Sequence, residues 1–152
     1  MMGKTNRQTG FTIVELLIVI VVIGILAAIT IVAYNAVQER ARVSSANSDL
    51  QLLNKAIHIA RINNNTHLLG ITGSNCTRCF DQARYELTLD RIGAASNINL
   101  NALKAGDPWG NNYSIDENEG EGANPCASRD GLGLLVGKTG VPGQIVPFYN
   151  CS

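Results

Sequence analysis

Residues 10–34 read GFTIVELLIVIVVIGILAAITIVAY, and this stretch decides the fold. From Phe11 to Tyr34 it holds 24 residues, and Glu15 is the one charged side chain among them. A helix of that length rises roughly 36 Å, enough to cross the roughly 30 Å hydrocarbon core of a bilayer. Sixteen of these residues are Leu, Ile, Val or Phe, and each favours insertion by about 0.3–0.6 kcal/mol. The stretch therefore predicts a transmembrane helix over residues 11–34.

A short basic segment comes before this helix. Lys4 and Arg7 give residues 1–10 a local charge of +2, without any acidic residue. By the positive-inside rule the N-terminus stays in the cytoplasm and everything after Tyr34 is exported. The run is too long for an ordinary secretory signal peptide, and no clear Ala-x-Ala cleavage site follows it. Over all 152 residues 12 basic and 12 acidic side chains cancel, so nucleic-acid binding is not predicted.

Glu15 is an acid inside an apolar run. A carboxylate costs about 2.5–3.5 kcal/mol at the bilayer centre on insertion scales, so such a residue usually serves a function. A cut after Gly10 would make Phe11 the new N-terminus and place its amine and Glu15 on one face of the helix. The carboxylate then has three alternatives: it pairs with the amine of a neighbouring subunit, pairs within its own helix, or stays protonated and silent.

The helical period continues beyond the apolar run. Apolar residues recur at spacings of three and four in one stripe that consists of Val43, Ala46, Leu50, Leu53, Ile57 and Ala60. Because no Pro or Gly interrupts residues 25–62, we expect one continuous helix over residues 11–62, with an amphipathic half at 35–62. The stripe favours a helix laid against a small sheet over a short coiled coil.

Residues 63–152 are expected to form an exported globular head. We expect a loop over 66–80, a short helix over 81–92, a turn at 99–104, a type I turn at Asp107–Gly110 with Trp109 packed beneath the helix, and strands at 113–116, 131–137 and 144–149. The fold class is therefore α+β: a long N-terminal helix packed on a small antiparallel sheet.

Four cysteines, Cys76, Cys79, Cys126 and Cys151, follow the apolar segment. An even number of cysteines in an exported domain favours disulfides. Three pairings are open, and we favour Cys76–Cys79 with Cys126–Cys151. A zinc site would need a second close pair, which Cys126 and Cys151 do not provide. A signal-anchored redox protein that uses Cys76 and Cys79 is the alternative from a different functional class.

An acidic stretch follows the strand expected at 113–116. A solvated loop is favoured there, and calcium bound through carboxylate oxygens is the alternative; the residues concerned are Asp116, Glu117, Glu119, Glu121 and Asp130. We expect no cofactor otherwise, and His58 is expected to be a surface or packing residue. Since no Ser-His-Asp set, phosphate-binding loop or pair of catalytic carboxylates can be argued, the chain is not expected to be an enzyme.

Residues 8–19, QTGFTIVELLIV, resemble the class III signal of the type IV pilin and type II secretion pseudopilin superfamily. The resemblance implies that a prepilin peptidase cleaves after Gly10, that Phe11 becomes the N-methylated terminus, and that Glu15 serves assembly. It implies a pilin-like fold and a structural subunit that packs with identical or related subunits in a helical filament. Membrane lipid before assembly and an inner-membrane assembly platform would be its other partners.

A weaker resemblance involves residues 107–113, DPWGNNY, which are similar to a segment of the major pseudopilins of type II secretion. Those proteins carry a calcium loop downstream, whereas residues 124–147 depart from it. Val32 stands where the superfamily usually has a proline, and a C-terminal cysteine pair is similar to the disulfide of type IV pilins. The resemblance thus implies a precursor in the inner membrane, and then either a cell-surface pilus or, alternatively, the periplasmic pseudopilus of a secretion or DNA-uptake system.

Overall fold

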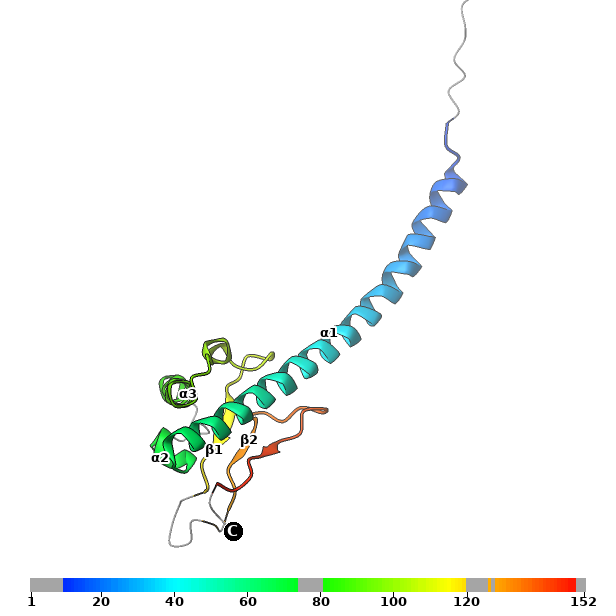
Figure 1. Cartoon of the computed structure of the whole chain (residues 1–152). Helices are drawn as coiled ribbons and strands as arrows, with labels where there is room; N and C mark the ends of the chain where they lie inside the picture. Colours follow the sequence, from blue (N-terminus) through cyan, green and yellow to red (C-terminus); the bar gives the residue numbers. More distant parts are fainter. Residues whose placement is uncertain (1–9, 74–80, 120–125, 127, 150–152) are drawn as a thin grey trace, which may run out of the picture. The chain divides into compact units, whose positions relative to one another are not determined.

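The computed structural model describes residues 10–73, 81–119, 126 and 128–149. Its elements are helix α1 (Ile13–Asn64), helix α2 (Leu68–Thr72), helix α3 (Gln82–Ser96), the 3-10 helix η2 (Asn101–Ala105), and strands β1 (Tyr113–Asp116), β2 (Gly131–Leu134) and β3 (Gln144–Ile145) (Figure 1). The strands form one antiparallel sheet in the order β1-β2-β3. A long N-terminal helix with a small antiparallel sheet confirms the predicted α+β class. The chain forms two compact units, Met1–Arg40 and Ala41–Ser152.

The first unit contains the apolar part of α1. Among the described residues α1 is the one helix long and apolar enough to cross a membrane. The large apolar side chains of residues 11–37 are exposed, from 48 % at Val22 to 85 % at Phe11. Lipid or other helices are the surroundings that such side chains require.

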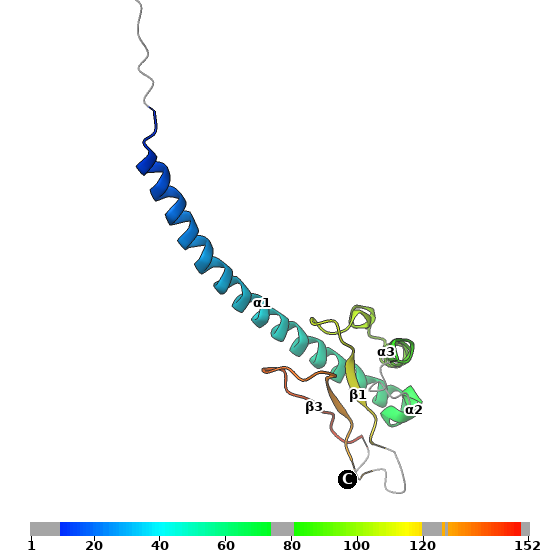
Figure 2. The same ribbon diagram turned by 180° about the vertical axis from the view of Figure 1, so that it is seen from behind.

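The second unit is built on the apolar stripe of α1. Five of the six predicted stripe residues are completely buried, and Val43 packs at the edge of the same core. β1 and β2 pair from Tyr113 opposite Leu134 to Asp116 opposite Gly131, and the inner face of the sheet contributes Ile115 and Leu132 to the core. The two opposite views show this part of α1 beside the sheet (Figures 1 and 2). The helix-on-sheet alternative is therefore correct for this unit.

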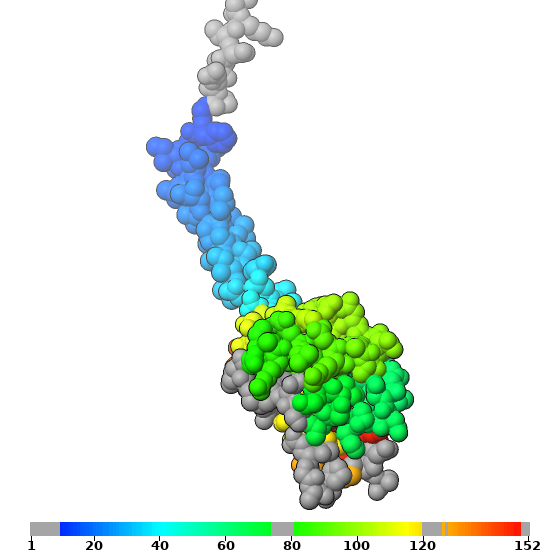
Figure 3. All heavy atoms as spheres, turned by 90° about the vertical axis from the view of Figure 1, so that its left-hand side faces the viewer, coloured from blue at the N-terminus to red at the C-terminus, as the bar shows by residue number. Residues whose placement is uncertain are grey.

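Helix α3 covers another part of the core with residues spaced three and four apart. Tyr85, Leu89 and Ile92 are completely buried. Asp81 caps the N-terminus of α3 by accepting a hydrogen bond from Ala83 N at 3.0 Å. Asn63 in the last turn of α1 donates to Ala95 O at 3.0 Å, and the space-filling view shows α3 beside the end of α1 on one face of this unit (Figure 3).

Several predicted elements have different bounds in the structure. The loop expected over 66–80 is wrong for Leu68–Thr72, which form α2 because Leu68 enters the core and Thr72 Oγ1 bonds to Leu68 O. Helix α3 extends to Ser96, beyond the predicted residue 92. The predicted strands at 131–137 and 144–149 shorten to Gly131–Leu134 and Gln144–Ile145.

The turn that begins at Asp107 is confirmed. Gly110 N donates to Asp107 O at 2.9 Å, and the Asp107 carboxylate accepts from Trp109 N and Asn111 N at 2.9 Å each. Gly110 has φ 87°, a left-handed conformation that glycine adopts without steric cost. Trp109 is partly buried against the core, and the Lys138 ammonium lies 5.6 Å from the centre of its ring.

Candidate functional site

Glu15 and Thr12 form a reciprocal pair of hydrogen bonds at the start of α1. Thr12 N and Thr12 Oγ1 each donate to Glu15 Oε2 at 2.8 Å, and Glu15 N donates to Thr12 Oγ1 at 3.3 Å. This arrangement is a capping box, in which a threonine and a glutamate three residues later satisfy backbone donors that the first helical turn leaves without partners. This role of Glu15 was not predicted from the sequence, although Thr-x-x-Glu before an apolar run is its ordinary signature.

The capping box stabilises the Glu15 carboxylate within an apolar segment. The negative charge lies at the N-terminal end of α1, where the helix dipole is positive and stabilises an anion. In the uncleaved chain Glu15 is therefore held by its own helix, through Thr12. The structure contains no cleaved terminus, so the pairing of Glu15 with a Phe11 amine stays a prediction.

Gly10 and Phe11 come before the first helical residue, Ile13. Both residues are exposed, and the space around the Cα of Gly10 is open, since an added Cβ would meet nothing within 4 Å. The peptide bond that joins them therefore lies outside the helix and is accessible to another protein.

A second polar site lies in the head, where Arg61 of α1 meets two carboxylates that are far away in sequence. Arg61 is 1 % exposed, and Glu119 and Asp130 are completely buried. Arg61 Nη2 lies 3.3 Å from Glu119 Oε2 and also donates to Asp130 Oδ2. Arg61 Nη1 donates to Pro147 O at 2.8 Å. The guanidinium thus joins α1 to the start of β2 and to the C-terminal segment. We call Arg61, Glu119 and Asp130 the buried charge cluster.

Glu119 makes the most connections in the buried charge cluster. Its Oε1 accepts from Tyr149 N at 2.6 Å and lies 3.1 Å from His67 Nδ1. Its backbone N donates to Asp130 Oδ1 at 2.7 Å. The prediction of a solvated acidic loop is wrong for Glu119 and Asp130, and also for Glu117, which is 6 % exposed. Burial is tolerated at Glu119 and Asp130 because the guanidinium lies beside both carboxylates as an opposite charge and donates a hydrogen bond to Asp130.

Arg61 was not among the residues singled out in the sequence, although a signal was present. It follows Ile57 by four residues and so lies on the same helical face as the apolar stripe. A charged residue on a buried face requires a partner. Helical spacing does not identify the partners of Arg61, because they lie 58 and 69 residues further along the chain.

Four of the five residues named as possible calcium ligands, Asp116, Glu117, Glu119 and Asp130, are described. Within residues 10–73, 81–119, 126 and 128–149, no three His, Cys, Asp or Glu side chains come together as metal ligands. Two of the predicted ligands, Glu119 and Asp130, face the guanidinium instead. Asp116 is the last residue of β1, and Glu121 lies outside the described residues.

Three of the four predicted disulfide residues, Cys76, Cys79 and Cys151, also lie outside the described residues. Cys126 is described, and the described part of the chain has no free cysteine. The pairing of Cys126 with Cys151 and of Cys76 with Cys79 stays a prediction.

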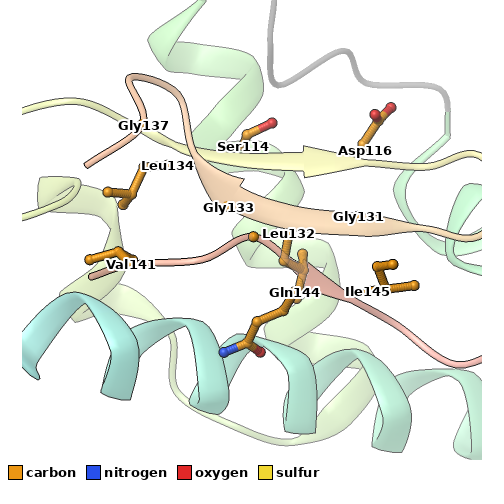
Figure 4. A pocket seen from close by; sticks show the side chains of 11 residues that line it. Ser114, Asp116, Gly131, Leu132, Gly133, Leu134, Gly137, Val141, Gln144 and Ile145 are labelled. Carbon is orange, nitrogen blue, oxygen red and sulfur yellow. The ribbon is translucent and has the colours of Figure 1, made fainter. Parts of the chain in front are cut away.

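Further polar contacts tie the head together. Tyr113 Oη donates to Asp49 Oδ2 at 2.6 Å, and burial together with this carboxylate raises the pKa of Tyr113 above its usual range. Gln144 extends from β3 toward α1, where its Oε1 accepts from Asn54 Nδ2 at 3.2 Å (Figure 4). His58 is half-buried, as expected for a packing residue, and partial burial and the nearby Arg61 lower its pKa.

The sheet carries a shallow pocket, lined by residues of all three strands and of the segment between β2 and β3. Gly131 and Gly133 of β2 and Gly143 contribute no side chains to it, and Ser114 and Asp116 of β1 lie along one side (Figure 4). Asp116 is the one His, Cys, Asp or Glu side chain in this lining, so the pocket does not offer several metal ligands.

Comparisons with known proteins agree with the site at the start of α1. Residues 5–31 match the prokaryotic N-terminal methylation motif. The chain is 32 % identical over 116 residues to type II secretion system core protein G of Escherichia coli (strain K12), which covers 75 % of each chain. It is 36 % identical over 109 residues to the type IV major fimbrial protein FimA of Dichelobacter nodosus, or 70 % of this chain and 69 % of the relative. No solved structure matches the chain significantly. These relatives cover more than two thirds of the chain, so it belongs to the superfamily of type IV pilins and type II secretion pseudopilins.

Proposed function

We propose that the chain is the structural subunit of a type IV pilus-like filament, made as a precursor, cleaved after Gly10 and assembled through its N-terminal helix. The observation that carries this proposal is the run of exposed apolar side chains that begins at Phe11. This run follows the accessible Gly10–Phe11 bond, and its first part lies within the matched methylation motif. A relative named as a type IV major fimbrial protein supports it. The chain would then act by packing with other subunits and would not be a catalyst.

Processing is the first step of the proposal. Residues 1–10 are the leader, and a prepilin peptidase cuts the Gly10–Phe11 bond at the cytoplasmic edge of the membrane. Gly10 has no side chain, so the backbone fits a narrow active site there. The new Phe11 amine is then methylated and keeps its positive charge.

Assembly is the second step. The apolar half of the helix, residues 11–34, leaves the lipid with the help of an inner-membrane platform and packs against the same half of other subunits. Residues 35–62 connect the apolar half of the helix to the exported head, residues 63–152. The predicted disulfides of the head persist in the oxidising surroundings outside the cytoplasm. The Glu15 carboxylate pairs with the Phe11 amine of a neighbouring subunit. The capping box with Thr12 holds this carboxylate at the start of the helix through its Oε2.

A periplasmic pseudopilin of a secretion or DNA-uptake system is the second candidate. It is favoured by the relative named as core protein G of a type II secretion system, which matches 75 % of the chain. Electron microscopy of the native host separates the two. Long surface fibres that contain this chain support the pilus, and their absence in cells that process the chain supports the pseudopilus.

The decisive experiment for the proposal is intact mass measurement and N-terminal sequencing of the protein from its native host. We expect a chain that begins with N-methylated Phe11. The variant Gly10→Val should remain an uncleaved, membrane-held precursor, because the branched side chain obstructs the peptidase. Gly3→Val, a matched change elsewhere in the leader, should be processed normally. A mature protein that still begins with methionine, or normal processing of Gly10→Val, would contradict the proposal.

A further inference from the structure

The buried charge cluster holds together segments that are distant in the chain. Glu119 and Asp130 stand at the two ends of the connection between β1 and β2 that passes through residues 120–129. Both side chains are completely buried, and both contact the same Nη2 of Arg61. Two carboxylates buried at one place require a cation or a proton, because an isolated buried charge is very unfavourable.

We infer that the Arg61 guanidinium is the internal cation of this connection, and that the folded head does not depend on calcium. A guanidinium suits the role because it stays charged when buried and presents several donors in a fixed plane. Here one nitrogen serves the two carboxylates and another donates to Pro147 O at 2.8 Å. His67, 31 % exposed, adds a further contact to Glu119 at 3.1 Å.

The same geometry disagrees with a calcium loop of the kind that major pseudopilins carry. Calcium takes six to eight oxygen ligands at about 2.3–2.6 Å, and it requires carboxylates that are free to turn toward it. Glu119 and Asp130 already face nitrogen donors on Arg61, and Glu119 Oε1 also accepts from Tyr149 N. A divalent cation close to these oxygens would lie beside a like charge within a buried site. The described residues also contain no group of three potential metal ligands.

The calcium arm of the test uses the full chain in detergent micelles, without reductant, and follows thermal unfolding by tryptophan fluorescence. Trp109 is the one tryptophan, and it packs against the core of the head, so its signal reports the head and not the apolar part of α1. We expect the same melting temperature in millimolar calcium and in excess EDTA. A site occupied at a hundredfold excess over its dissociation constant would raise it by roughly 10 °C, and such a rise would overturn the inference.

The substitution arm asks whether the charge of Arg61 has the proposed role. Arg61→Met keeps much of the side-chain length and leaves the two carboxylates without their cation, so we expect a fall in melting temperature of roughly 12–20 °C. The control Arg84→Met removes an arginine that is 56 % exposed and only 3.5 Å from Asp81, and it should shift melting by about 2–4 °C at most. Equal shifts for both variants would overturn the inference.

A triple variant distinguishes the effect of charge from the effect of packing. It also provides the test if Arg61→Met alone does not fold. Arg61→Met combined with Glu119→Gln and Asp130→Asn removes the guanidinium and both carboxylates together. We expect it to fold and to melt above Arg61→Met, because no uncompensated charge remains buried. A triple variant that melts no higher than Arg61→Met, or that fails to fold, would show that the guanidinium does not act as the cation of the cluster. None of these measurements involves processing or filament assembly, so their outcome is independent of the proposed function.

Discussion

Replacement of Tyr113 by phenylalanine tests a hydrogen bond to a carboxylate that joins α1 to the sheet. Tyr113 is completely buried in β1, and its hydroxyl donates to Asp49 Oδ2 of α1 at 2.6 Å. A hydrogen bond to a charged acceptor contributes about 1.5–3 kcal/mol. Tyr113→Phe keeps the ring in the core and removes only the hydroxyl, so the free energy of unfolding of the head should fall by about that amount.

The same hydroxyl makes the head sensitive to high pH. Burial, followed by the hydrogen bond to Asp49, raises the pKa of Tyr113 above its usual value, and burial does the same for Tyr85. The folded state therefore holds these protons more tightly than the unfolded state, in which tyrosine titrates near pH 10. This contribution to stability is complete below about pH 10 and is lost as the pH rises further. Above that pH the free energy of unfolding falls by about 1.4 kcal/mol per pH unit for each tyrosine.

The measurement is urea unfolding of the full chain in detergent micelles, followed by Trp109 fluorescence, at pH 7 and at several pH values above 10. Tyr34→Phe is the matched control because Tyr34 is 63 % exposed on α1. At pH 7 we expect a lower free energy of unfolding for Tyr113→Phe than for the wild type, and an unchanged free energy of unfolding for Tyr34→Phe. Above pH 10 the decline should be less steep for Tyr113→Phe than for the wild type. If the two variants differ by less than about 0.5 kcal/mol at pH 7, or if all three proteins lose stability equally at high pH, the reasoning is wrong.

Two further predictions concern the two halves of α1. Glu15→Ala should be cleaved and methylated normally but should yield no filaments, as measured by sheared-fibre yield and N-terminal sequencing; wild-type yield would contradict the proposed role of the carboxylate in assembly. Leu53→Ala, which empties a completely buried position, should lower the free energy of unfolding by about 2–5 kcal/mol. Leu52→Ala, at a neighbouring residue that is 38 % exposed, should cost far less in the same denaturant titration, and equal losses would contradict the assignment of the buried face.

Much of α1 could be predicted because its signals are local. The apolar run, the stripe that ends at Ala60 and the asparagines that follow it predicted a helix over 11–62, and the structure has Ile13–Asn64. The capping box was equally local, since Thr12 and Glu15 are three residues apart. It was not predicted, because the position of Glu15 in an apolar run points first to the cost of a charge in lipid.

The short elements of the head were predicted less well. β3 has two residues, Gln144 and Ile145, and such a strand has too few side chains to show a period. α2 is a five-residue helix that depends on the burial of Leu68 in a core assembled from other segments. Propensity is a weak guide where tertiary packing decides which residues are buried.

The sequence by itself determined that the chain has a long helix with an apolar half and an amphipathic half, together with a precursor motif at its start. These features depend on composition and on spacings of three and four residues, which are local properties of a segment. Only the tertiary structure decided that Arg61 lies between Glu119 and Asp130, and that an acidic stretch expected in solvent is buried. The physical reason is that a buried charge is stable only beside an opposite charge, and folding brings that partner from a distant part of the chain.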